Sequence, residues 1–335
     1  MTAAVAAQTP RAGSMTLGKA ITAGLHRAML DDPKVVVLGE DVGALGGVFR
    51  ITEGLQKEFG PERVIDSPLA ESAIVGAAIG LALRGYRPVC EIQFDGFIYP
   101  AFDQLVSQLA KIRARSGGAV SCPVVIRVPA GGGIGAVEHH SESNEAYFAH
   151  TAGLRVVSCS SPNDAYRLIR AAVASDDPVI FYEPKRRYWD RGSVDLSAGP
   201  ASLDRALVLR SGADVTLIAH GPTVKTALEA AEAAAEDGVS VGVVDLRTIS
   251  PLDFSALRRC GEQTGRVVVV HEASTFLGIG AEISAWITEH CFASLKAPVL
   301  RVGAYNMPYP PARVEDDFLP NVDRILHAVD QSLAF

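Results

Sequence analysis

A carboxylate in an otherwise apolar helix is the first feature of this sequence that points to chemistry. The run Asp66-Ser-Pro-Leu-Ala-Glu-Ser-Ala-Ile-Val-Gly predicts a strand end turning into a helix, with Ser67 as N-cap and Pro68 as first helical residue. With that cap, the capping-box position falls on Ala70, so Glu71 comes one residue too late to cap the helix. Burial beside apolar residues raises a carboxyl pKa and permits proton sharing, which makes Glu71 a candidate acid or base.

Small residues follow Glu71 along the same helix. Ser72, Gly76 and Gly80 recur at every fourth position and form a stripe that another backbone could approach closely. Each glycine costs up to about 1 kcal/mol of helix propensity, so we expect a tight helix contact to offset that loss. Composition alone favours a plainer explanation, in which Glu71 interacts with the positive helix N-terminus and the glycines only pack.

Two adjacent histidines follow a glycine-rich loop. His139 and His140 come after Gly131-Gly-Gly-Ile-Gly, and taken alone a histidine there is more simply a solvated loop residue. Neither this run nor Gly278-Ile-Gly280 has the full G-x-G-x-x-G spacing after a strand with an acidic residue downstream, so neither predicts a nucleotide site. We expect both to be turns or close approaches of the backbone.

The elements that must position these residues alternate between short apolar runs and helical patterns. Runs typical of strands occupy residues 35–38, 63–65, 88–92, 124–128 and 155–158. A segment rich in Gly, Ser and Pro, residues 191–203, marks the expected domain junction. After it, strands alternate with helices expected near residues 223–237, 253–263 and 280–292. The pattern predicts an α/β fold of two doubly wound domains, residues 16–195 and residues 205–335.

Bulk properties exclude several classes of protein. A chain of 335 residues is about twice a common domain length, in line with two domains. The net charge of -7 and the lack of a basic, aromatic-rich stretch argue against nucleic acid and against anionic membrane surfaces as partners. The longest apolar run, residues 72–83, falls short of the roughly 20 residues that a membrane span needs.

The cysteines and the N-terminus complete this picture. Five widely separated cysteines without a CxxC pair favour a reduced cytoplasm over a disulfide framework or a zinc site. Residues 1–15 lack the apolar core of a signal peptide and are expected to form a flexible tail, with Met15 left open as an alternative start.

The spacing of Glu71, Gly76 and Gly80 resembles the glutamate motif of thiamine-diphosphate enzymes that divide their active site between two chains. The resemblance extends, in order, to GEDVGALGGVFRITEGL at 39–55, EIQFDGFIYPAFDQ at 91–104, HSESNEAYFAH at 140–150, DPVIFYEPKRRYW at 177–189 and DLRTISPLD at 245–253. It covers nearly the whole chain after residue 15. The sequence is therefore similar to the β subunits of 2-oxo acid dehydrogenase E1 components, which implies a transketolase-like pyrimidine-binding domain followed by a transketolase C-terminal-like domain.

The resemblance also implies roles for individual residues. Glu71 would share a proton with the pyrimidine N1′ of thiamine diphosphate. His140, which starts the family's H-S-x-S-x-E-A pattern, would be the active-site histidine near the transfer of the acyl group to a lipoyl group. Phe97 and Leu69 would contact the cofactor's pyrimidine, with core packing as the alternative for both. Glu142 stands where the family usually has glutamine, which weakens the match there.

A missing motif implies a partner. The sequence has no GDG followed downstream by asparagine, the pattern with which such enzymes hold Mg²⁺ and diphosphate, so an E1 α subunit would supply it in an α2β2 heterotetramer. No metal ligand is predicted in this chain. An E2 acyltransferase with lipoyl and subunit-binding domains would be the second partner. A K⁺ site in relatives is built mostly from backbone carbonyls, so the sequence leaves K⁺ open.

Substrate and rival functions stay as alternatives. The segments at 140–150 and 177–189 resemble branched-chain members more than pyruvate members, so we expect oxidative decarboxylation of branched-chain 2-oxo acids, with pyruvate or acetoin dehydrogenase as the alternative. A non-catalytic transketolase-like scaffold would not need Glu71 and His140. A free-standing nucleotide-binding protein would need a complete phosphate loop, which is absent.

Overall fold

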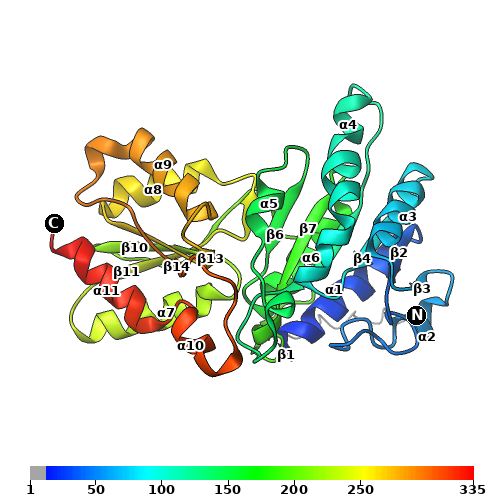
Figure 1. Cartoon of the computed structure of the whole chain (residues 1–335), viewed down its shortest axis with the longest axis horizontal. Coiled ribbons are helices and arrows are strands. Elements are labelled where there is room, and N and C mark those ends of the chain that lie inside the picture. The colour runs from blue at the N-terminus through cyan, green and yellow to red at the C-terminus, as the bar shows by residue number, and fades with distance from the viewer. Residues whose placement is uncertain (1–12) are drawn as a thin grey trace, which may run out of the picture.

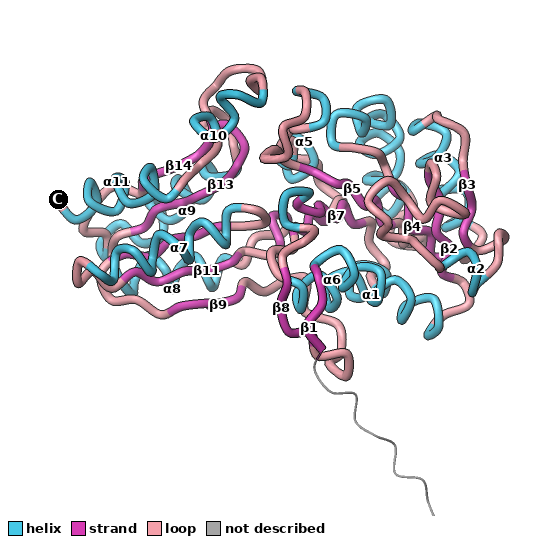
Figure 2. The backbone as a smooth tube through the Cα atoms, turned by 90° about the horizontal axis from the view of Figure 1, so that it is seen from below, coloured by secondary structure: helices cyan, strands magenta, loops and turns pink. Residues whose placement is uncertain are grey.

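The computed structural model describes residues 13–335, which form two α/β domains lying side by side (Figures 1 and 2). Each domain contains a mainly parallel sheet with helices on both faces, because its strands are apolar on both sides and each face must be covered. The expected fold class is confirmed.

The first sheet has seven strands in the order β12-β6-β7-β5-β4-β2-β3, all parallel except β12, which runs antiparallel to β6. Its strands are β2 (Val35–Gly39), β3 (Val64–Asp66), β4 (Arg87–Glu91), β5 (Val125–Ala130), β6 (Arg155–Ser158), β7 (Val179–Pro184) and β12 (Thr248–Ser250). All five strands expected from the apolar runs are present. β12 lies in the sequence of the second domain, so the first sheet crosses the expected junction.

Helices cover the two faces of this sheet. Successive strand residues point to opposite faces, so Val125 packs against α1 and α6 while Ile126 packs against α3. The first face carries α1 (Leu17–Asp31) and α6 (Pro162–Ala174). The second carries α3 (Glu71–Leu83), η1 (Asp95–Ala101) and α5 (Glu145–Ala149). Shorter elements connect them, namely α2 (Leu55–Phe59), η2 (Gln104–Gln108), η3 (Leu109–Lys111), α4 (Ile112–Arg115), η4 (Glu138–His140) and η5 (Lys185–Arg187).

The second sheet has five strands in the order β14-β13-β10-β11-β9, with only β9 antiparallel. Its strands are β9 (Leu207–Arg210), β10 (Val215–Ala219), β11 (Val241–Asp245), β13 (Val267–Ser274) and β14 (Leu300–Ala304). One face packs against α7 (Thr223–Glu236) and α11 (Val322–Leu333), the other against α8 (Phe254–Thr264) and α9 (Ile279–Cys291). The three expected helices are thus confirmed. The last connections are η6 (Phe292–Ser294), η7 (Ala312–Val314) and α10 (Glu315–Phe318).

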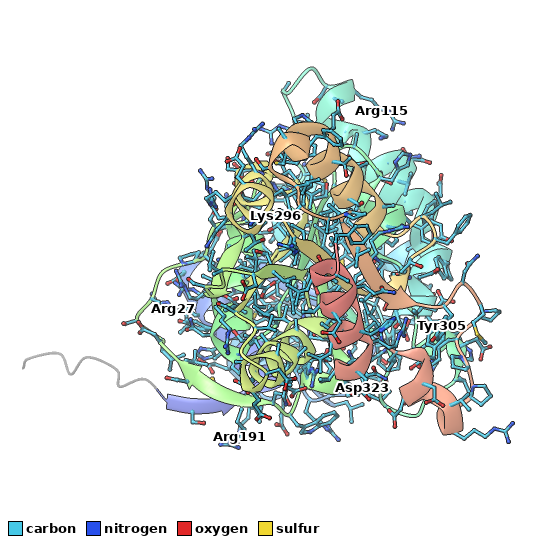
Figure 3. The ribbon with its side chains drawn as sticks, turned by 90° about the vertical axis from the view of Figure 1, so that its left-hand side faces the viewer. Arg27, Arg115, Arg191, Lys296, Tyr305 and Asp323 are labelled. Atoms are coloured by element: carbon cyan, nitrogen blue, oxygen red, sulfur yellow. The ribbon has the colours of Figure 1, made fainter. Side chains whose placement is uncertain are left out.

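A two-stranded ribbon lies outside both sheets. β1 (Gly13–Thr16) pairs antiparallel with β8 (Arg191–Val194), and Figure 2 shows this ribbon below α6. The predicted tail, residues 1–15, lies outside the described residues up to position 12. Its last three residues were predicted wrongly, because their backbone groups pair with β8. In Figure 3, Arg115 at the end of α4 lies at the top of the view and Arg191 of β8 at the bottom.

Two features of the described part of the chain concern membrane-spanning helices and disulfides. Within residues 13–335 no helix is long and apolar enough to cross a membrane. All five cysteines are buried, and none forms a disulfide.

Candidate active site

The candidate residues come together at the carboxyl ends of neighbouring parallel strands. Glu40 directly follows β2, Glu71 follows β3, Phe97 lies in η1 after β4, and His140 lies in the loop after β5. These strands are adjacent in the sheet, in the order β5-β4-β2-β3, and α3 packs against η1. Ligand sites in open α/β sheets form at this edge. The fold therefore gathers motifs that lie far apart in the sequence.

The helix that carries Glu71 begins later than the sequence suggests. Ser67 is not its N-cap, because the Ser67 backbone N–H donates to the Gly39 carbonyl at 2.8 Å and so continues the pairing of β3 with β2. The residue before a proline also favours an extended backbone. Ala70 becomes the N-cap and Glu71 the first helical residue. Its carboxylate therefore lies at the positive end of the helix.

Glu71 is largely buried, but its carboxylate oxygens keep some access to solvent. The residue is only 6% exposed, and within residues 13–335 its side chain has no hydrogen-bond or ion-pair partner. Glu40 lies close to Glu71. Burial, and then electrostatic repulsion from Glu71, raise the pKa of Glu40. The Glu40 backbone carbonyl accepts a hydrogen bond from Gln93 Nε2 at 2.6 Å. Sequence reasoning did not single out Glu40, although a carboxylate directly after a buried strand was the available signal.

The two residues expected to contact a cofactor differ in their surroundings. Leu69 is 78% exposed in this chain, which excludes core packing as the reason for its presence. Phe97 is half-buried and packs against the core on the α3 face of the sheet.

His140 sits in an aromatic cluster. Its ring centroid lies 5.2 Å from that of Phe94, 5.3 Å from Phe97 and 4.5 Å from His139, each in an edge-to-face arrangement. His140 Nδ1 is buried and has no hydrogen-bond partner among residues 13–335. The structure thus brings Phe97 and His140 together, as the sequence predicted for one site.

A buried ion pair beneath the loop was not foreseen. Lys185 Nζ lies 2.9 Å from Asp95 Oδ2, with both side chains fully buried, and also donates to the His140 carbonyl at 2.7 Å. Asp95 Oδ2 accepts a further hydrogen bond from the Gly131 backbone N–H at 3.0 Å. Burial raises the pKa of Asp95 to about 7 and lowers that of Lys185, while each charge opposes the shift of the other. In the sequence, a lysine directly after a strand pattern was the feature that could have indicated this ion pair.

Glu142 does not interact with His140. Its carboxylate instead accepts a hydrogen bond from the Tyr99 hydroxyl. Burial, together with this hydrogen bond, raises the pKa of Tyr99. Glu142, which stands where the family usually has glutamine, is thus hydrogen-bonded to Tyr99.

A charged triad lies inside the sheet close to this edge. Arg127 on β5 is fully buried between Glu91 on β4 and Glu183 on β7, with nitrogen to oxygen distances of 2.6 Å to each. A second hydrogen bond to Glu183 measures 2.9 Å, and Tyr188 donates to the same carboxylate at 2.6 Å. The strands β4, β5 and β7 are neighbours, so their side chains meet across the sheet. In the sequence, the feature that could have indicated this triad was Arg127, a charged residue inside an otherwise apolar strand.

The glycine-rich loop binds carboxylates of its own chain. Gly132 N–H donates to Glu272 Oε1 at 2.6 Å, and Gly133 and Gly135 donate to Glu315 at 2.9 and 3.0 Å. Backbone N–H groups arranged in this way form an anion-binding nest. A Cβ added to Gly132 would lie 1.9 Å from the Tyr309 hydroxyl, so the expected close approach is confirmed. Gly278 and Gly280 likewise approach the His271 ring closely.

Each of the two domains matches a known protein family. Residues 13–189 match the family model "Transketolase, pyrimidine binding domain", and residues 204–325 match "Transketolase, C-terminal domain". One solved structure, a split gene transketolase described as an inactive beta4 tetramer, superposes with a TM-score of 0.79 at 23% identity, covering 96% of this chain and 99% of that one. At that identity the likeness supports the fold alone.

Curated relatives are much closer in sequence. The chain is 57% identical to the pyruvate dehydrogenase E1 component subunit beta of Leifsonia xyli, over 99% of this chain and 98% of that protein. It is 53% identical to the 3-methyl-2-oxobutanoate dehydrogenase subunit beta of Mycobacterium tuberculosis, over 96% and 92%. It is 45% identical to the pyruvate dehydrogenase E1 component subunit beta of Bacillus subtilis, over 96% and 99%.

Proposed function

The chain belongs to the E1 β subunits of 2-oxo acid dehydrogenase complexes, and from this premise we propose that Glu71 and His140 are its catalytic residues. The observation that carries the proposal is the place of Glu71, which is 6% exposed and has no side-chain partner within residues 13–335, at the start of a helix on the sheet edge where ligands bind. The Glu71 oxygens are not among the enclosed polar atoms that lack a partner, so they are accessible to a hydrogen-bond donor from outside this chain.

The donor set at this edge fits the pyrimidine side of thiamine diphosphate. When bound, the cofactor supplies an electron sink for cleavage of the bond to the carboxyl group. Glu71 would hold a proton in a hydrogen bond with the pyrimidine N1′. Leu69 and Phe97 would contact the ring, since the first is exposed beside Glu71 and the second lies between α3 and His140. The half-buried His140 ring, whose Nδ1 is enclosed and whose Nε2 is not, would hold or donate a proton during acyl transfer to the lipoyl group.

We further propose that an E1 α subunit covers the exposed face of α3. Ser72, Ala73, Ala77, Gly80 and Leu83 are exposed there, although the helix is apolar along most of its length. Apart from its own helix, a Cβ on Gly80 would meet no atom of residues 13–335 within 4 Å, so the expected helix contact would have to come from a partner. The α subunit would complete an α2β2 heterotetramer and hold Mg²⁺ and the diphosphate. The E2 acyltransferase would bind through its subunit-binding domain.

For the substrate we propose a branched-chain 2-oxo acid, on the resemblance of residues 140–150 and 177–189 to branched-chain members. Pyruvate is the second candidate, because the relative at 57% identity is a pyruvate dehydrogenase subunit and the branched-chain relative is nearly as close at 53%.

The test is decarboxylation by the purified chain with and without its α subunit, given thiamine diphosphate and Mg²⁺, with 3-methyl-2-oxobutanoate compared with pyruvate. We expect activity only with the partner, and a higher kcat/KM for the branched acid. A higher value for pyruvate would reverse the substrate assignment, and activity of the chain alone would contradict the divided site. Replacing K⁺ by Na⁺ in the same assay tests for a potassium requirement.

Glu71→Gln in the reconstituted tetramer tests the catalytic role. Loss of an acid–base group lowers rates by about 100-fold or more, so we expect at least that loss of decarboxylation with assembly intact by size exclusion. Glu62→Gln, at an exposed position, is the matched control. Unchanged turnover of Glu71→Gln would remove Glu71 from the mechanism and favour a scaffold role.

A further inference from the structure

The loop that carries His140 is fastened at its base to the first domain. Gly131 N–H donates to both the Glu142 carbonyl and Asp95 Oδ2, each at 3.0 Å, which closes residues 131–142 into a loop. Lys185 Nζ then holds the His140 carbonyl at 2.7 Å. These contacts fix where the loop leaves and rejoins the domain.

The tip of the same loop is held by the second domain. Both carboxylate oxygens of Glu315, at the start of α10, are used: Oε1 accepts from Gly133 N–H at 2.9 Å and Oε2 from Gly135 N–H at 3.0 Å. The Tyr309 hydroxyl donates to Glu315 Oε1 at 2.5 Å and accepts from Gly133 N–H at 3.2 Å. Glu315 is buried, so these charge-assisted hydrogen bonds are shielded from solvent.

Glu272 makes the third attachment. Its Oε1 accepts from Gly132 N–H at 2.6 Å and from Ser143 Oγ at 3.2 Å, and its Oε2 lies 2.9 Å from Arg186 Nη1. Glu272 therefore joins the tip of the loop, the residue that follows Glu142, and η5.

The backbone of the loop is shaped for these carboxylates. Gly131, Gly133 and Gly135 have φ values of +84°, +83° and +70°, a conformation that residues other than glycine rarely adopt. In this conformation the N–H groups of Gly132, Gly133 and Gly135 point to the carboxylates of Glu272 and Glu315. In a nucleotide-binding protein, the backbone N–H groups of such a glycine-rich loop bind phosphate. In this chain they bind two carboxylates of the second domain, Glu272 and Glu315.

Lys185 and the packing of η4 against η1 hold the His140 backbone, and packing holds its ring. Its neighbours are the aromatic rings of Phe94, Phe97 and His139, which constrain it by packing, and its Nδ1 has no partner among residues 13–335. We propose that Glu315, assisted by Tyr309 and Glu272, is a positioning residue for His140, through which the second domain sets the rate of acyl transfer to the lipoyl group. This inference rests on the proposed function of His140.

The segment that supplies Glu315 is partly exposed. Residues 305–321 connect β14 to α11, and Tyr305, labelled in Figure 3 at the rim of the second domain, is exposed, as is Met307. Phe318 packs with Ala304 and Leu319 in a small separate cluster that Tyr309 also joins. Asp316 and Asp317, next to Glu315, are exposed and make no hydrogen bond or ion pair within residues 13–335. The chain thus offers a matched control on the same short helix.

The experiment uses the reconstituted α2β2 tetramer with thiamine diphosphate and Mg²⁺. Two rates are measured: decarboxylation with an artificial electron acceptor, and acylation of a free lipoyl domain. Small displacements of a catalytic group cost about 10-fold to 100-fold, so Glu315→Gln should lower kcat for lipoyl acylation by about 10-fold or more, and several times more than it lowers decarboxylation. Glu315→Asp, which keeps the charge, should lose less. Asp317→Asn should match the wild type in both rates.

A double-mutant cycle with His140→Ala separates positioning from general stability. If Glu315 acts through His140, Glu315→Gln causes no further loss of acylation in the His140→Ala background. An equal loss in both backgrounds, or no loss in the wild-type background, would overturn the inference. If Glu315→Gln does not assemble, Tyr309→Phe takes its place in the same cycle, with a loss of about 3-fold expected from one missing hydrogen bond.

The two proposals fail in different ways. A wild-type tetramer that does not decarboxylate any 2-oxo acid would contradict the proposed function. An active tetramer in which Glu315→Gln leaves the ratio of the two rates unchanged would contradict only the positioning role.

Discussion

Replacing Arg127 by methionine should strongly destabilise the first domain. The guanidinium is fully buried and forms three hydrogen bonds of 2.6 to 2.9 Å with the carboxylates of Glu91 and Glu183. Methionine fills a similar volume but leaves two carboxylates facing each other inside the sheet. Removing one partner of a buried ion pair costs about 3–5 kcal/mol, because the remaining charge is desolvated and unpaired.

The size of this effect can be expressed as a melting temperature. For a domain of this size about 1 kcal/mol shifts Tm by roughly 2–4 °C, so Arg127→Met should lower the first unfolding transition by about 6–20 °C at pH 7. Burial already raises the pKa of Glu91 while Arg127 opposes that shift, and without Arg127 the pKa rises further. A carboxyl group whose folded pKa is raised destabilises the fold only above its unfolded pKa of about 4.3. The loss should therefore shrink as the pH falls toward 4.

Differential scanning calorimetry of Arg127→Met between pH 4 and 8 provides the measurement. Arg313→Met, at an exposed position without a partner in the described residues, is the control. The triple variant Glu91→Gln, Arg127→Met, Glu183→Gln should regain part of the stability, because no net charge stays buried. A Tm for Arg127→Met within about 2 °C of the control at pH 7 would refute the reasoning, as would a loss that does not depend on pH.

Three further predictions concern the partner, the cofactor and the pH range. Gly80→Leu should leave the melting temperature of the isolated chain unchanged or raised, since nothing lies within 4 Å of an added Cβ and leucine favours a helix. It should weaken association with the α subunit by about 10-fold or more in analytical ultracentrifugation, and equal association would contradict the proposed interface. Leu69→Ala should leave Tm unchanged, because the side chain is 78% exposed. It should raise the KM for thiamine diphosphate by about 10-fold in titrations of activity. An unaltered KM would remove Leu69 from the cofactor site. Burial, followed by repulsion from His271, lowers the pKa of His220 to about 3, so stability is full above the unfolded pKa of about 6.5 and falls as the pH drops toward 3. His220→Gln should flatten this acid side of the Tm profile, and a profile as steep as that of the wild type would show that His220 does not cause it.

The local features of the chain could be predicted from its sequence. Apolar runs bounded by turn residues predicted the strands β2 to β6, because a strand buried on both faces needs apolar side chains along its own length. The same reasoning predicted α7, α8 and α9. The motif around Glu71 and the pattern starting at His140 identified two candidate residues that the fold places at one edge of the sheet, and their catalytic roles stay predictions.

The long-range pairings were decided only by the tertiary structure. Glu315 meets Gly133 across 182 residues, and Lys185 meets Asp95 across 90, and no local pattern specifies which buried charge or backbone nest a given carboxylate will find. The helix of Glu71 starts at that residue because the preceding segment continues the pairing of β3 with β2, which outweighs the local capping signal of Ser67. β12 likewise joins the sheet of the first domain through a long-range pairing, because its hydrogen-bonding partner is β6. The sequence determined which segments are buried and which residues could react, whereas packing determined what those residues contact.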